Sequence, residues 1–167
     1  MSKITTLEEL YVEQLKDLYS TETQLIKALP EMAEAAHARE LQAGFKHHLE
    51  QTREHAQRLE QILDTLDEKP TGNKCEAMAG LIKEGKKTIG EDAPPEIKDA
   101  ALIAAAQRVE HYEIAGYGCV RAYASILGDD EAVELLQTTL DEEADTDKKL
   151  TSIAEKLNLE AEALSSR

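Results

Sequence analysis

Three glutamates from separate parts of the chain, Glu22, Glu113 and Glu143, stand where helical periodicity predicts buried positions. Glu22 continues the apolar arc that contains Leu18, and Glu113, in the stretch VEHYEIAGYG, shares a helix face with Tyr117. Each acid lies near the middle of its predicted helix, so an antiparallel bundle would bring the three together. Carboxylates that meet in a low-dielectric interior must be protonated, paired with bases or neutralised by a cation. The inward faces carry no Lys or Arg at that level, so a metal ion is the leading explanation.

Imidazole nitrogens are supplied by the stretch HHLEQTREHAQRL. His48, Thr52 and His55 fall on the apolar arc of this helix, which makes His55 the first histidine candidate and His48 the second. An oxygen-rich site with one or two imidazoles suits iron or manganese, and zinc is not excluded. A single inward histidine can equally be a hydrogen-bonded core residue.

Several polar residues lie beside these positions. Asp147 flanks Glu143 and is a further candidate metal ligand, as is Glu110 at the edge of its arc. Glu110 and Glu142 both occupy marginal positions, where a long acid usually extends into solvent. Tyr117 is expected to pack in the core or to hydrogen-bond a ligand carboxylate.

Long amphipathic segments must position these groups. Apolar residues at helical spacing predict four long helices, with a shorter one between the second and third, at about residues 5–37, 41–67, 74–89, 96–127 and 130–157. Pro30 is expected to kink the first helix without ending it, and Gly128 to end the fourth segment. Short first and last connections with a long middle one describe an all-α, ferritin-like four-helix bundle with one crossover, in a single domain over 1–167.

Composition narrows the possible partners. The net charge of -15 from 34 acidic and 19 basic residues disfavours nucleic acid and anionic membranes, and it equally describes an ordinary solvated helix surface. No signal peptide and no long uncharged apolar run is visible, so a cytoplasmic protein is expected. Cys75 and Cys119 stand far apart and indicate neither a disulfide framework nor a zinc knuckle.

Over most of its length the chain resembles the YciF-like family of bacterial ferritin-like stress proteins. The resemblance is carried by LYSTETQLIKALPEMA, HLEQTREHAQRLEQIL, KCEAMAGLIKEG, DAALIAAAQRVEHYEIAGYG and TLDEEADTDKKLTSIAEKLN. It implies a rubrerythrin-type bundle, a homodimer, a role in stress responses and a dinuclear metal centre.

The wider ferritin-like pattern has one Glu on the first and third long helices and Glu-x-x-His on the second and fourth. Glu22, Glu113, His55 and Glu143 match it. Thr52 stands in the expected Glu slot and Thr146 in the expected His slot, while His48 and Asp147 lie one turn away and are possible substitutes. A single-metal, asymmetric or vacant site therefore stays open.

Three functions follow from these patterns. The first is a metal-dependent oxidoreductase that handles a small oxidant such as oxygen or peroxide. The second is a non-catalytic structural or interaction protein with a degenerate metal site, and the third is an iron-storage cage.

Overall fold

The computed structural model describes residues 4–166 and contains five α-helices in that range, with no strand among these residues. They are α1 (Leu7–Ala35), α2 (Arg39–Thr65), α3 (Glu76–Gly90), α4 (Pro95–Leu127) and α5 (Asp130–Glu162), followed by a 3-10 turn at Ala163–Ser166. The prediction of an all-helical protein is confirmed. The last helix continues beyond the predicted end at residue 157, because the sequence after it keeps the helical pattern with a buried Ala161.

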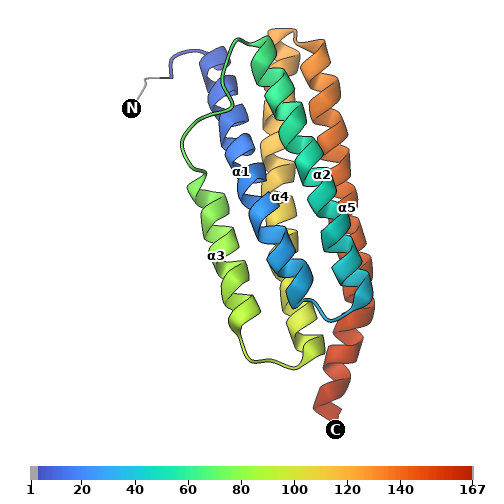
Figure 1. Cartoon of the computed structure of the whole chain (residues 1–167). Helices are drawn as coiled ribbons and strands as arrows, with labels where there is room; N and C mark the ends of the chain where they lie inside the picture. The colour runs from blue at the N-terminus through green and yellow to red at the C-terminus, as the bar shows by residue number, and fades with distance from the viewer. Residues whose placement is uncertain (1–3, 167) are drawn as a thin grey trace.

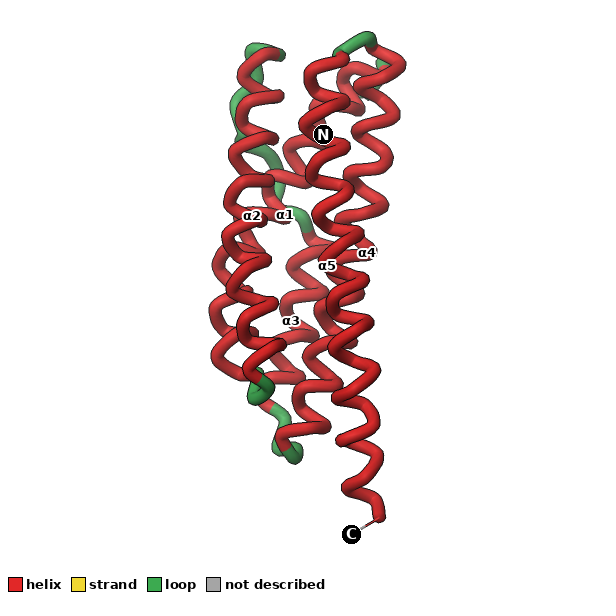
Figure 2. The backbone as a smooth tube through the Cα atoms, turned by 90° about the vertical axis from the view of Figure 1, so that its right-hand side faces the viewer, coloured by secondary structure: helices red, strands yellow, loops and turns green. Residues whose placement is uncertain are grey.

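The four long helices form the bundle, and α3 lies against its side (Figures 1 and 2). Helices α1 and α2 are antiparallel neighbours, as are α4 and α5. Helix α3 packs beside α1 and α4 and carries the chain back to the other end of the bundle before α4 begins. The predicted crossover is therefore confirmed, and the C-terminal end of α5 extends beyond the other helices.

Local sequence signals define several helix ends. Thr6 caps α1 in a reciprocal capping box, in which its hydroxyl accepts from the backbone N–H of Glu9 and the Glu9 carboxylate accepts from the backbone of Thr6. Gly128 ends α4 with φ 78°, a left-handed conformation that favours glycine. Pro30 lies inside α1, which continues to Ala35 as predicted.

The core consists of two apolar clusters at opposite ends of the bundle. The upper cluster contains Tyr11, Leu15, Leu18, Leu59, Ile62, Leu63, Tyr117, Val120, Ala124, Ala132 and Leu136. The lower cluster contains Leu25, Leu29, Ala33, Ala36, Leu41, Phe45, Cys75, Met78, Leu102, Ile103, Ala106, Leu150, Ile153 and Leu157. Gly116 allows α1 and α4 to approach closely, because a Cβ at this position would lie only 2.8 Å from Cδ2 of Leu18.

Two buried charged residues at the start of α4 hold the lower connections. The Asp99 carboxylate accepts from the backbone N–H groups of His37 at 2.8 Å and Ala38 at 2.7 Å, which fixes the turn between α1 and α2. The Lys98 ammonium donates to backbone carbonyls at the end of α3, including that of Ile89 at 2.7 Å. These contacts were not predicted from the sequence.

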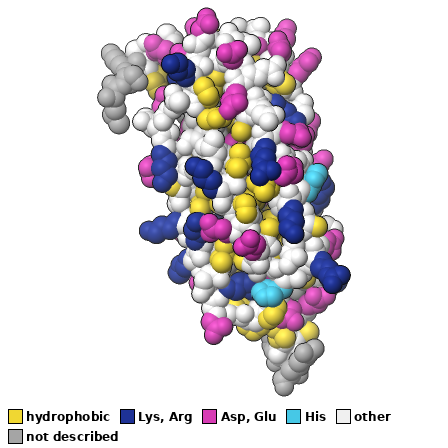
Figure 3. Space-filling view, in the orientation of Figure 1, with side chains coloured by type: hydrophobic (Ala, Val, Ile, Leu, Met, Phe, Trp, Pro, Cys, Tyr) yellow, Lys and Arg dark blue, Asp and Glu magenta, His cyan; other side chains and the backbone are white. Residues whose placement is uncertain are grey.

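The face shown in Figure 3 mixes acidic and basic side chains around a run of apolar side chains along its middle. Within the part of the chain that the structure describes, no helix combines the length and apolar character needed to cross a membrane.

Candidate metal centre

A layer of buried polar side chains separates the two core clusters. On each long helix the inward residues change from apolar to polar and back again, for example from Leu18 through Glu22 to Leu25 on α1. We call this the polar layer; its members are Glu22, His48, Thr52, His55, Glu110, Glu113, Thr139, Glu143 and Thr146. Helical periodicity places these residues inward. Because the polar stretch lies at the same depth on all four long helices, the side chains meet in one layer.

One group in the polar layer consists of Glu22 from α1, His55 from α2 and Glu143 from α5. Nδ1 of His55 lies 2.9 Å from Oε1 of Glu143 and 3.8 Å from Oε1 of Glu22. The Tyr117 hydroxyl donates a hydrogen bond to Oε1 of Glu22. The expected contact between a tyrosine and a candidate ligand carboxylate is thus present.

A second group consists of His48 from α2, Glu110 and Glu113 from α4, and again Glu143. Nε2 of His48 lies 3.3 Å from Oε1 of Glu110 and 3.7 Å from Oε2 of Glu143. In each group, one donor atom per residue can be chosen so that all the chosen atoms lie within 4.8 Å of one another. Metal–ligand bonds of about 2.0–2.2 Å place opposite ligands about 4 Å apart, so both groups match the size of a coordination sphere.

The hydrogen bonding of the two groups is incomplete. Six carboxylate oxygens have no hydrogen-bond partner, namely Oε2 of Glu22, Oε2 of Glu110 and both oxygens of Glu113 and Glu143. The inner nitrogens, Nε2 of His48 and Nδ1 of His55, also lack one. Buried polar atoms without partners are costly, and their convergence on a common space is what a cation would compensate. Four carboxylates with two imidazoles form a donor set that suits iron, manganese or zinc, so the residues present fit a metal ion.

Burial and mutual repulsion shift the ionisation of these acids. Burial raises the pKa of Glu22 from 4.5 to about 8, and burial together with the charge of Glu143 raises the pKa values of Glu110 and Glu113 well above their usual range. Burial also disfavours the charged form of Glu143, but its close ion pair with His55 outweighs that and lowers its pKa. Although burial disfavours the imidazolium, Glu143 and Glu22 raise the pKa of His55 to about 9.

The stability of the metal-free protein is expected to fall as pH rises from 6.5 to 8. In this window the folded state retains protons on Glu22 and His55 that the unfolded chain has released, so raising the pH favours unfolding. The raised pKa values of Glu110 and Glu113 act in the same direction. Burial lowers the pKa of His48, so its contribution changes only below 6.5. We expect the free energy of unfolding to fall by about 1–3 kcal/mol, as measured by urea titration of metal-stripped protein. Stability that rises with pH in this window would contradict the prediction.

The outer nitrogen of His55 is held by an ion pair at the bundle surface. Nε2 of His55 lies 2.9 Å from Oε2 of Glu142, and that carboxylate accepts from Nη1 of Arg58 at 2.5 Å. Nη1 of Arg58 also donates to the Thr139 hydroxyl at 3.0 Å. A carboxylate on the outer nitrogen fixes the orientation of an imidazole and increases its basicity toward a metal. Glu142 therefore does not simply extend into solvent, as its marginal position had indicated.

The substitution Arg58→Ala is expected to weaken metal binding about 10- to 100-fold, because Glu142 would lose its anchor and His55 its fixed orientation. Isothermal titration calorimetry with Mn²⁺ measures the change. Arg53→Ala is the matched control, since Arg53 lies on the same helix and, among residues 4–166, forms its ion pair with the exposed Glu50 at 2.6 Å. Equal affinity for Mn²⁺ in Arg58→Ala and Arg53→Ala would show that the ion pair between Arg58 and Glu142 has no role in metal binding.

Two of the marginal candidates differ from expectation. The prediction that Glu110 lies at the margin is wrong, because its residue is only 2% exposed and its carboxylate faces His48. Asp147 does not join either group: its side chain lies 3.1 Å from Nε2 of Gln107 and 3.3 Å from Nε2 of His111, on the outer side of α4. Asp147 is thus not placed to substitute for a missing ligand.

The two threonines in expected ligand slots have other partners. The Thr52 hydroxyl donates to the backbone carbonyl of His48 at 2.8 Å, and Oγ1 of Thr146 lies 3.4 Å from Nδ1 of His48. The second imidazole therefore comes from His48 on α2 instead of position 146 on α5. Glu110 supplies a carboxylate from α4, so six polar residues surround the centre despite both departures.

These helices and their carboxylate–imidazole interior define a ferritin-like four-helix bundle with an added crossover helix. The chain belongs to the family described as "Domain of unknown function (DUF892)", whose model matches residues 6–163. It is 44% identical over 150 residues to Protein YciF of Escherichia coli strain K12, covering 89% of this chain and 90% of YciF.

Solved structures agree with this assignment. The crystal structure of the E. coli stress protein YciF superposes with a TM-score of 0.90 at 42% identity, covering 92% of this chain and 98% of that one. The protein YcfI from Rhodopseudomonas palustris matches with a TM-score of 0.86 at 46% identity, covering 90% and 96%. A dodecameric thioferritin from Bacteroides fragilis, at 17% identity, covers 95% and 91% with a TM-score of 0.72 and supports the ferritin-like fold alone.

Proposed function

We propose that this protein binds two iron or manganese ions in the polar layer and acts in metal-dependent redox or peroxide handling during bacterial stress. The observation that carries the proposal is the pair of donor groups that share Glu143, with six partnerless carboxylate oxygens between them. A carboxylate common to two adjacent groups has one oxygen available for each of two ions. Similarity to the E. coli stress protein supports the biological setting.

The chain would supply binding, orientation and exclusion of water. Glu22, His55 and Glu143 would hold one ion, and His48, Glu110 and Glu113 with the shared Glu143 would hold the other. When bound, iron or manganese supplies a redox couple and coordination positions for oxygen or peroxide. The apolar clusters above and below the layer limit the access of bulk water and strengthen the electrostatic interactions inside it. We further propose a cytoplasmic homodimer, which light scattering after size exclusion tests.

Elemental analysis of protein expressed with iron and manganese both available tests the metal site directly. We expect about two ions per chain, in line with the two donor groups. Calorimetric titration of metal-stripped protein provides the independent measurement. Absence of metal after purification, together with no binding heat for either ion, would contradict the proposal.

The alternative is a non-catalytic structural or interaction protein, and the observation in its favour is the presence of Thr52 and Thr146 in the expected ligand slots. The two functions differ in whether the protein catalyses the consumption of an oxidant. The metal-loaded protein is expected to consume dioxygen or hydrogen peroxide in the presence of a reductant, while the metal-stripped protein is not. Metal binding without any consumption would favour the structural role.

A further inference from the structure

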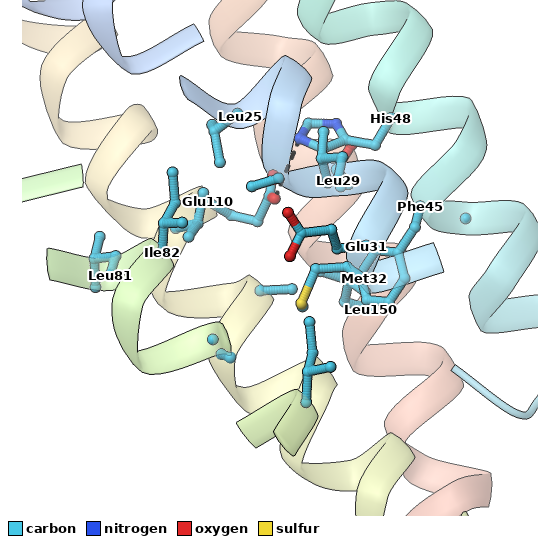
Figure 4. A pocket seen from close by; sticks show the side chains of 18 of the residues that line it. Leu25, Leu29, Glu31, Met32, Phe45, His48, Leu81, Ile82, Glu110 and Leu150 are labelled. Atoms are coloured by element: carbon cyan, nitrogen blue, oxygen red, sulfur yellow. Dashed lines mark hydrogen bonds and ion pairs between the residues drawn. The ribbon is translucent and has the colours of Figure 1, made fainter. Parts of the chain in front are cut away.

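An apolar cavity extends from the polar layer into the lower core cluster (Figure 4). All five α-helices contribute to its walls, including Leu29 and Met32 of α1, Phe45 of α2 and Ile82 of α3. The space available to the centre of a water molecule is about 70 Å³. Since one water molecule occupies roughly 10–15 Å³, the cavity accommodates several water-sized atoms.

The two ends of the cavity differ in character. Its inner wall includes His48, Glu110 and Thr146, so this end reaches the second donor group of the polar layer. Its lining also includes Glu31 and Lys86, whose side chains are half exposed and form an ion pair of 2.8 Å between α1 and α3. The cavity therefore connects the solvent-exposed side of α3 with the buried carboxylates.

We propose that this cavity binds a small apolar molecule against the edge of the centre formed by His48 and Glu110. Between its two polar ends the walls are mainly aliphatic, aromatic or thioether, so water there finds few hydrogen-bond partners while an apolar molecule gains contacts. Hydrogen peroxide, which needs several hydrogen bonds, does not match these walls. Dioxygen and a short hydrocarbon chain both do. This inference goes beyond the proposed function, because the chain forms the cavity without any bound metal ion.

A pair of glycines on α3 provides a matched test. Gly85 is buried in the cavity wall, and a Cβ there would meet Sδ of Met32 at 3.9 Å, so a longer side chain would enter the space. Gly80 lies on the same helix and is exposed, and a Cβ there would meet nothing within 4 Å. Both substitutions replace a helical glycine by a better helix former, so their difference isolates the filling of the cavity.

Methyl NMR of metal-free protein and of protein loaded with diamagnetic Zn²⁺, both under pressurised xenon, tests the proposal. Saturable shifts are expected for the methyl groups of Leu29, Ile82 and Leu150 in both forms. Gly85→Leu is expected to lower the affinity for xenon at least about tenfold, while Gly80→Leu retains it. Ala105→Leu, which fills the cavity from α4, serves the same purpose if Gly85→Leu does not fold.

Experiments with two further gases distinguish whether the cavity binds dioxygen or a hydrocarbon chain. Dissolved dioxygen would selectively broaden the same methyl signals because it is paramagnetic, and n-butane would shift them. Selective broadening without binding of n-butane identifies dioxygen as the guest, and saturable n-butane binding identifies a hydrocarbon chain. No saturable xenon binding, or an equal loss in Gly80→Leu, would overturn the proposal. Xenon binding in a protein that takes up no metal would support the cavity site and contradict only the proposed function.

Discussion

Glu143→Gln is expected to abolish binding of both metal ions while leaving the helical fold intact. Glu143 is the one residue common to the two donor groups, and each of its oxygens faces a different histidine, Oε1 toward His55 and Oε2 toward His48. The amide has nearly the same volume but carries no charge and offers only one oxygen. Because loss of an outer hydrogen-bond partner already costs about 10- to 100-fold in affinity, loss of the shared carboxylate should cost more than about 100-fold for both ions.

Elemental analysis and calorimetric titration measure this effect, and circular dichroism verifies the fold. Glu134→Gln is the matched control, since it makes the same chemical change at an exposed position of α5 and should retain the full metal content. The variant Glu22→Gln should lose mainly one ion, because Glu22 belongs to a single group. Retention of two ions by Glu143→Gln would exclude a shared carboxylate.

Glu113→Leu is expected to stabilise the metal-free protein and to weaken its metal binding. Both carboxylate oxygens of Glu113 are buried without a hydrogen-bond partner, and burial and neighbouring acids raise its pKa well above the usual range. An apolar side chain of similar volume removes this penalty, which we estimate at about 1–3 kcal/mol in the free energy of unfolding. Urea unfolding of metal-stripped protein measures the gain, and the stabilisation produced by added Mn²⁺ should shrink in the same variant.

Glu134→Leu again serves as the control, because an exposed substitution should change stability by no more than about 0.5 kcal/mol. A metal-free Glu113→Leu protein that is less stable than the wild type would show that Glu113 makes favourable interactions without a cation. The two predictions together distinguish a site maintained for metal from a polar core that contributes to folding.

Helical periodicity in the sequence was sufficient to predict most residues of the candidate metal centre. Glu22, His55 and Glu143 lie centrally on strongly amphipathic helices, and the structure brings them together as one donor group. Glu113 was found in the same way and joins Glu143 in the other group. Periodicity succeeded because an inward carboxylate among leucines is rare enough to stand out. That these residues bind metal stays a prediction.

Residues at the margin of an arc could not be assigned in this way. Glu110, Glu142 and Asp147 have similar positions on their helical wheels, yet one is buried at the centre, one anchors His55 and one faces away. Whether such a residue is buried depends on small rotations of its helix and on which side chain lies opposite it. Arg58 was missed because its partner Glu142 belongs to α5, and only packing brings the two helices together.

The amino-acid sequence by itself determined the helices, their crossover order and the inward direction of the central acids, since these follow from local propensity and from the 3.6-residue period. Only the tertiary structure decided that His48 stands opposite Thr146 and that Glu110 turns inward. It likewise decided that Glu143 is shared by two groups and that a cavity leads to them. The physical reason is that rotation and depth of each helix are set by the packing of the two apolar clusters, a property of five helices together.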